Sequence, residues 1–217
     1  MPGYSHAKGP YASSDRPTRA YRKVSDEIER WLRAESDPSL GGLVELFGEK
    51  SFAILFVLLL GVPALPLPTG GATHLFEIVA MLLALELIAG RREVWLPRRW
   101  SQLGLAGDKQ RRFMAKLMGL IRWLERFSRP RLRFAFERSW SNRVYGLLVL
   151  AGSAAAFFAP PFTGLDTLPA LGVVLLSLGV LLEDVIVVAV GLVVGAAGVL
   201  LEIIVGSAVV HGVSSIF

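Results

Sequence analysis

Residues 51–92 read SFAILFVLLLGVPALPLPTGGATHLFEIVAMLLALELIAGRR, and this stretch decides the fold class. Two apolar runs, 51–67 and 75–89, flank a turn rich in proline and glycine, and the charged residues within them are Glu77 and Glu86. Each run would be roughly 22–26 Å long as a helix, less than the hydrocarbon core of a bilayer at about 30 Å. The pattern predicts a helical hairpin in a membrane, either as two thin spans or as a re-entrant loop.

A second hairpin of the same kind lies in the other half of the chain. An apolar run at 144–159 ends at two prolines, and another follows at 168–182. The chain then stays mostly apolar over 185–217, which would reach roughly 50 Å as one helix. Because that length exceeds one untilted span, we expect a break near 195–198 or 202–206.

The charges are strongly segregated along the 217 residues. Hydrophobic residues make up 53% of the chain and charged residues 19%, with a net charge of +5. The 91–143 connection holds fifteen Lys or Arg and four acids, whereas 51–90 and 144–217 hold no Lys or Arg at all. The positive-inside rule places this connection and the N-terminal region in the cytoplasm, and we favour that interpretation over nucleic-acid binding.

The polar parts of the chain contain amphipathic helices. Residues 1–20 show no periodicity and are expected to be a disordered tail. An amphipathic helix is predicted from Ser25, which is a candidate cap, and a short interfacial helix over 41–48. A basic helix capped by Asp108 has one apolar face, which suits either an in-plane position at an anionic leaflet or packing on the rest of the protein.

An internal duplication is indicated by residues outside the apolar runs. Six identities in eleven positions relate two segments at a shift of 92: Arg30, Trp31, Leu32, Ser36, Pro38 and Leu40 against Arg122, Trp123, Leu124, Ser128, Pro130 and Leu132. The sequence therefore divides into repeat 1 at 21–92, repeat 2 at 93–184 and a C-terminal transmembrane segment at 185–217. The fold class predicted is an all-α integral membrane protein of two repeated hairpins with in-plane amphipathic helices.

Several motifs resemble those of the ExoD family of bacterial inner-membrane proteins. They are GLVELFGEKSF at 42–52, LPLPTG at 65–70, GRR at 90–92 with WLPR at 95–98, and LGVLLED at 178–184. The resemblance covers roughly residues 25–205. It implies a protein of the cell inner membrane with a role in exopolysaccharide production and in tolerance of alkaline conditions; the apolar runs predict that it is multi-pass. It implies no known reaction and no catalytic residues.

One group of polar side chains lies near the two hairpin turns. Glu77 is a candidate functional residue because a charge inside a membrane is costly, and His74 shares its helical face. If the two turns meet, the pathway for an ion or substrate comprises Glu77, His74, Thr73, Thr69, Thr163 and Asp166. Asp166 has an alternative role as the cap of the helix that follows it. Glu202 and His211 lie in the final apolar segment and are not assigned to the pathway.

A second group lies at the predicted cytoplasmic interface. We expect Glu86 to pair with Arg91 or Arg92. Glu183 and Asp184 would either form an ion pair with the same arginines across the repeats or cap the next helix. Basic residues there suit phosphate head groups or serve only as topology signals. They are Lys50, Arg143, Arg91, Arg92, Arg98 and Arg99.

The leading functional hypothesis is a small transporter of protons or monovalent cations. One alternative is transport or binding of lipid-linked anions such as polyprenyl phosphate, and another is a non-transporting scaffold for the polysaccharide synthesis machinery. No catalytic triad, nucleotide-binding motif or metal-binding pattern is found, so we expect no enzyme activity, cofactor or metal. The absence of Cys excludes disulfides and Cys-ligated metals. The partners expected are an anionic bilayer and, through the close-packing Gly191 and Gly195, a homo-oligomer.

Overall fold

The computed structural model describes residues 23–35, 37–65, 73–91, 93–102, 104, 107–128, 139–159 and 164–214. Within these ranges the chain is helical and contains no strand, as the sequence predicts. The predicted disordered tail at 1–20 and most of both hairpin turns lie outside the described residues.

The helices follow the apolar runs closely. The N-terminal elements are α1 (Val24–Ala34), α2 (Leu40–Phe47), the 3-10 turn η1 (Gly48–Lys50), α3 (Ser51–Leu60) and α4 (Thr73–Ile88). The later elements are α5 (Arg98–Ser101), α6 (Asp108–Phe127), α7 (Ser139–Phe158), α8 (Thr167–Leu182) and α9 (Val185–Ser214). The short interfacial helix expected over 41–48 is α2, and the four hairpin helices are α3, α4, α7 and α8.

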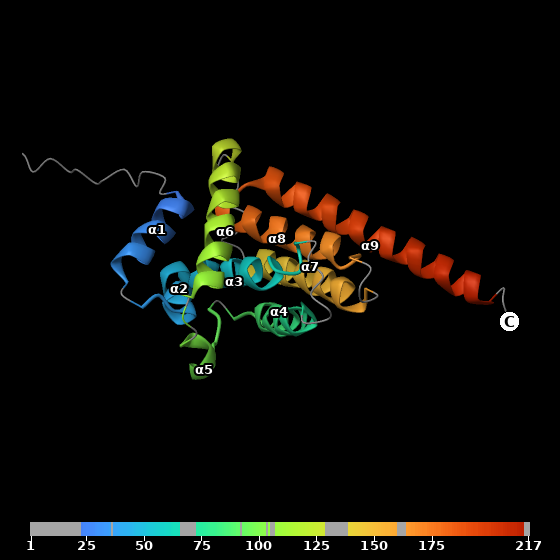
Figure 1. Ribbon diagram of the computed structural model, residues 1–217, viewed down its shortest axis with the longest axis horizontal. Helices are drawn as coiled ribbons and strands as arrows, with labels where there is room; N and C mark the ends of the chain where they lie inside the picture. The colour runs from blue at the N-terminus through green and yellow to red at the C-terminus, as the bar shows by residue number, and fades with distance from the viewer. Residues whose placement is uncertain are drawn as a thin grey trace, which may run out of the picture.

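Four helices form the centre of the molecule. α3 packs against α4 and α8, and α7 packs against the same two helices from the other side. α9 lies along α8 and also touches α7 (Figure 1). α3 is buried around nearly its whole circumference, with Phe52 and Phe56 among the most buried large side chains. A helix that is apolar on all sides is typical of such a central position.

α9 is a single continuous helix, so the predicted break within it is wrong. Its 30 residues correspond to roughly 45 Å, and its C-terminal half extends beyond the other helices (Figure 1). Glycines hold its first half against α8: a Cβ on Gly172 would lie 2.3 Å from the Gly195 Cα, and one on Gly191 would lie 2.4 Å from the Leu176 nitrogen. The glycines therefore serve close helix packing instead of interrupting the helix.

α1 and α6 pair with each other, and their helix starts differ from those predicted. Ser25 lies inside α1 and does not cap it; its backbone N–H and its hydroxyl both donate to the Glu125 carboxylate of α6. Glu29 and Arg122 join the same two helices by an ion pair. Asp108 is likewise the first residue of α6, and Gly107 occupies the cap position. At Ser25 a long-range partner thus replaced the local capping that the sequence suggested.

The basic helix α6 packs on the protein. It crosses the direction of the hairpin helices (Figure 1), and residues on its apolar face are buried: Met114, Leu117, Met118, Ile121 and Leu124. The ring of Phe113 approaches Gly61, directly after α3. The packed position of the helix is therefore confirmed, whereas its relation to a membrane stays a prediction.

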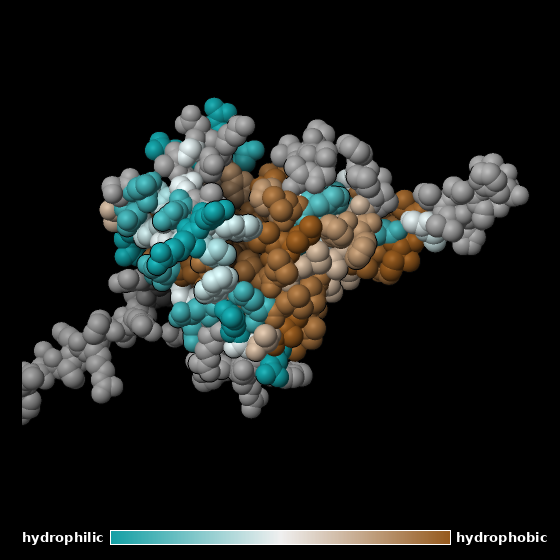
Figure 2. All heavy atoms as spheres, turned by 90° about the horizontal axis from the view of Figure 1, so that it is seen from below, coloured by the Kyte–Doolittle hydropathy of each residue, from teal (hydrophilic) through white to brown (hydrophobic). Residues whose placement is uncertain are grey.

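One helix in the described chain is long and apolar enough to cross a membrane. It is the Val185–Ala208 part of α9, judged by length and composition, and α8 is a shorter apolar helix. On the face shown in Figure 2, hydrophilic residues gather at one end and hydrophobic residues cover the middle. These observations give weak support to a membrane location, and the number of spans stays a prediction.

Candidate functional site

A buried acid–imidazole pair lies on the first turn and a half of α4. Nδ1 of His74 and Oε2 of Glu77 share a hydrogen bond of 2.8 Å, and the Glu77 side chain is 0% exposed. The His74 ring is 30% exposed and packs edge-on against Phe157 of α7, with 5.2 Å between the ring centroids. The i, i+3 spacing explains the pairing, and burial of the α4–α7 contact explains why Glu77 is removed from solvent.

The charges of two further carboxylates act on this region. The charge of Asp166, directly before α8, interacts with that of Glu77, and Glu202 of α9 interacts with both. Glu202 reaches this place because α9 runs back along α8, with Gly198 against Pro169. The site therefore draws on α4, the start of α8 and the middle of α9. We call His74, Glu77, Asp166 and Glu202 the acidic cluster.

The acidic cluster has unused hydrogen-bonding capacity. Oε1 of Glu77 and Oε1 of Glu202 are both buried and have no hydrogen-bond partner in the structure. A buried carboxyl oxygen without a partner carries a desolvation cost that a proton or a cation would relieve. No group of three His, Asp or Glu side chains among the described residues is arranged to hold a metal ion. The two unpartnered carboxyl oxygens can therefore each accept a proton or a hydrogen bond.

The structure gathers most of the predicted pathway residues that it describes. Glu77 and His74 pair, the charge of Asp166 acts on Glu77, and Thr73 is buried at the first position of α4. Asp166 occupies the N-cap position of α8, but its side chain makes no capping hydrogen bond. Thr69 and Thr163 lie outside the described residues. Glu202 was not assigned to the pathway from sequence. The sequence feature that could have indicated its position is the spacing of the glycines that place α9 along α8.

At the other end of the hairpins, an ion pair joins the two halves of the chain. Nζ of Lys50 lies 2.8 Å from Oε1 of Glu183 and also donates to the Leu181 carbonyl oxygen. A cross-repeat pair involving Glu183 was predicted, but with Arg91 or Arg92 as partner. Asp184 accepts a hydrogen bond from the Ile186 N–H at the start of α9, which confirms the capping alternative, although Asp184 is buried.

The predicted pairing of Glu86 with Arg91 is wrong. Oε2 of Glu86 is buried without a hydrogen-bond partner, and Arg91 bonds to Glu86 only through the backbone. Arg92 lies outside the described residues. Arg91 and Arg143 are exposed, as are Arg98 and Arg99. These four arginines are therefore on the surface, and the charge of Lys50 is already matched by Glu183.

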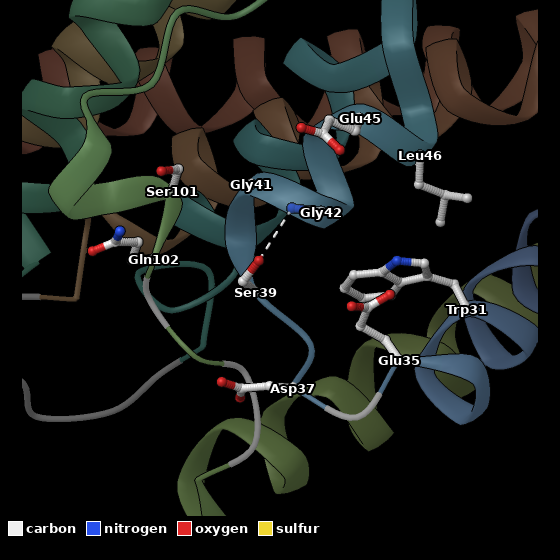
Figure 3. Close-up of a pocket in the computed structure, with 10 residues that line it drawn as sticks. All are labelled: Trp31, Glu35, Asp37, Ser39, Gly41, Gly42, Glu45, Leu46, Ser101 and Gln102. Atoms are coloured by element: carbon white, nitrogen blue, oxygen red, sulfur yellow. Dashed lines mark hydrogen bonds between the residues drawn. The ribbon is translucent and has the colours of Figure 1, made fainter.

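An acidic groove opens between α1, α2 and α5. It has a volume of about 610 Å³, and Figure 3 shows Trp31 and Leu46 on one side and Ser101 and Gln102 on the other. Its described lining contains Glu35, Asp37 and Glu45 and no Lys or Arg. Ser39 caps α2 here by accepting a hydrogen bond from the Gly42 N–H. No buried polar group of the described lining points into this groove to indicate a ligand.

Comparison with known proteins identifies relatives of the whole helical region. Residues 24–204 match the family described as "Exopolysaccharide synthesis, ExoD". An uncharacterized protein from Synechocystis sp. is 28% identical over 165 residues, covering 75% of this chain and 77% of that protein. Protein ExoD from Rhizobium meliloti is 33% identical over 143 residues, covering 65% of this chain and 59% of that protein. No solved structure matches the chain significantly.

Proposed function

Because the chain belongs to the ExoD family, which is linked to exopolysaccharide synthesis, we propose that it is a small membrane protein that moves protons or monovalent cations. The observation that carries this proposal is Glu77. It is fully buried, bonded to His74 on one oxygen and unpartnered on the other, with two more carboxylates as neighbours. A link to alkaline tolerance would follow from proton movement.

The chemistry of the acidic cluster favours cationic cargo. One imidazole pairs with Glu77 while the charges of Asp166 and Glu202 act on the same region, so binding a proton or a monovalent cation would compensate the excess of negative charge. Ionisable groups inside membrane segments commonly mark such pathways. Histidine adds a group that exchanges protons near neutral pH. No chemical step other than protonation is required of these residues.

A bilayer is the proposed setting for this site. α4 carries an apolar stripe of Leu75, Ile78, Leu82 and Leu85, whose side chains are between 40% and 63% exposed. Exposed apolar patches of this kind mark membrane or protein contacts. With α9 as one span, we propose a multi-pass inner-membrane protein whose N-terminal region and 91–143 connection face the cytoplasm.

Three of the four hairpin helices are short for full spans, which favours re-entrant hairpins. α3 corresponds to roughly 15 Å and α4 and α8 to roughly 24 Å each, shorter than a hydrocarbon core of about 30 Å, whereas α7, with 20 residues, corresponds to roughly 30 Å. The contacts also agree with a duplication in which α3 corresponds to α7 and α4 to α8. The contact of α3 with α4 has its counterpart in that of α7 with α8, and the contact of α3 with α8 has its counterpart in that of α7 with α4. A two-fold axis running along the helices would bring the two turns to the same end.

The direct test is ion flux in proteoliposomes. The purified full chain is reconstituted, a pH or Na⁺ gradient is imposed, and an internal dye reports the flux. We expect flux in the wild type and flux at the level of empty liposomes for Glu77→Gln, because glutamine keeps the shape of the side chain and removes its proton. Glu202→Gln should also reduce flux, because it removes another acid of the same cluster.

The matched control is Glu45→Gln, which neutralises an exposed acid of α2 outside the acidic cluster. It should transport like the wild type. If Glu77→Gln and Glu202→Gln both transport at the wild-type rate, the acidic cluster is not the ion pathway. Absence of flux from correctly inserted wild-type protein would refute transport of these ions altogether.

A further inference from the structure

A second cavity, separate from the acidic cluster, lies between α2, α3, α4 and the segment that leads into α5. Its volume is about 260 Å³. We call it the tryptophan pocket, and it is lined by Leu40, Leu55, Leu59, Val79, Leu82, Leu83, Glu86, Trp95, Leu96, Pro97 and Trp100. All but one of these residues are apolar or aromatic, and the exception is Glu86. Glu86 lies nine residues beyond Glu77, about 13 Å along α4 and on the opposite face.

Glu86 presents an unsatisfied acceptor at this pocket. Its Oε2 is buried and has no hydrogen-bond partner in the structure. The described lining contains no Lys or Arg, and the nearby Arg98 and Arg99 are exposed and do not belong to it. Leaving a carboxyl oxygen buried and unpaired is unfavourable, so the pocket favours an occupant that carries a positive charge or a hydrogen-bond donor.

The two tryptophans add a second preference for a cation. Trp95 is 64% exposed and Trp100 is 38% exposed, although both belong to the pocket wall. Indole faces attract ammonium groups, and aromatic side chains beside a carboxylate are a usual way to recognise quaternary ammonium ligands. The remaining leucines and valine offer only apolar surface, which suits a hydrocarbon segment.

We propose that the tryptophan pocket binds an amphiphile with an ammonium head group and an alkyl chain. The ammonium group lies against Glu86 and the indoles of Trp95 and Trp100. The first carbons of the chain lie against the leucines of α3 and α4. An anionic head such as phosphate or sulfate is disfavoured, because Glu86 is the ionisable side chain of the described lining. This site is independent of the proposed ion pathway.

The test measures binding to the purified full chain in a maltoside detergent by calorimetry. Hexyltrimethylammonium is the probe, and hexyl sulfate and hexanol are the matched ligands of opposite and zero charge. We expect saturable binding of the ammonium compound only. Glu86→Gln should weaken it about ten-fold or more, because a charge-assisted contact is lost. Trp95→Leu, at a position that is 64% exposed, should weaken it about three-fold.

Glu45→Gln is the control and should bind hexyltrimethylammonium like the wild type. Equal or tighter binding of hexyl sulfate, or an affinity unchanged by both Glu86→Gln and Trp95→Leu, would overturn the proposal. Competition then identifies the source of the ammonium group. Displacement of the probe by short-chain phosphatidylethanolamine points to a lipid, displacement by hexylamine alone points to a free amine, and displacement by neither contradicts the proposal.

Discussion

At the residue scale, the contact between His74 and Glu77 is the feature that gives the site its chemistry. A single hydrogen bond of 2.8 Å holds one oxygen of a carboxyl group that is otherwise removed from solvent. The imidazole is itself partly exposed and lies against Phe157. His74 is therefore more exposed than the carboxyl group to which it is bonded, as the proposed proton relay requires.

We predict that His74→Gln separates proton movement from cation movement. Glutamine retains a donor for Glu77 but does not exchange protons, so proton flux should fall strongly while Na⁺ flux, where present, is retained. The measurement is flux in proteoliposomes under a pH gradient and, separately, under a Na⁺ gradient. Unchanged proton flux in this variant would show that His74 only positions Glu77.

At the scale of the elements, the contact between α8 and α9 depends on glycine. The backbone of α8 comes so close to Gly191 that no side chain fits there, whereas a Cβ on Gly206, on the same helix, would meet nothing within 4 Å. α9 brings Glu202 into the acidic cluster because this contact fixes the position of α9 along α8. The packing of two helices thus controls the composition of the site.

We predict opposite effects of one methyl group at two positions of α9. Gly191→Ala should destabilise the protein by about 1–3 kcal/mol, because the two backbones must separate. Gly206→Ala should be neutral or stabilise it by up to about 1 kcal/mol, because alanine favours the helix and meets no neighbour. Thermal unfolding of both variants in detergent measures this difference. Equal midpoints would contradict the close approach of α8 and α9.

At the scale of the whole molecule, contacts between distant segments join the two halves of the chain. Lys50, before α3, pairs with Glu183, after α8, and Ser25 of α1 bonds to Glu125 of α6. The first of these contacts lies at the end of the hairpins and the second on the amphipathic helices. Together these contacts join the two halves of the chain at the ends of the hairpins and at the amphipathic helices.

We predict that Lys50 and Glu183 are energetically coupled. Because both side chains are partly exposed, at 39% and 24%, the coupling should be only about 0.5–1 kcal/mol. Unfolding of Lys50→Met, Glu183→Gln and the double variant gives this value as a double-mutant cycle. Additive effects of the two substitutions would show that the pair makes no net contribution.

The proposed membrane setting predicts a clear pattern of chemical labelling. The chain has no cysteine, so a single one can be introduced at any place. Leu82→Cys, on the apolar stripe of α4, should be protected from a water-soluble maleimide in membrane vesicles and react after detergent denaturation. Glu45→Cys should react in inside-out vesicles before denaturation. Equal labelling of both variants in intact vesicles would contradict the membrane position of α4.

Sequence alone determined the features that depend on neighbouring residues. The apolar runs predicted the helices α3, α4, α7 and α8, and the i, i+3 spacing predicted the meeting of His74 and Glu77. These predictions succeeded because helix formation and contacts along one helical face follow the 3.6-residue period. The family motifs were also recognisable, because they are local strings of residues.

Only the tertiary structure decided which distant residues meet. It brought Glu202 to the acidic cluster, gave Glu183 the partner Lys50 instead of Arg91, and used Ser25 for a bond to α6 instead of a helix cap. It also kept α9 continuous, because its glycines contact α8. Such outcomes depend on how whole helices pack against one another. Several residues of the same charge are available as partners, and no local sequence pattern determines which of them is brought into contact.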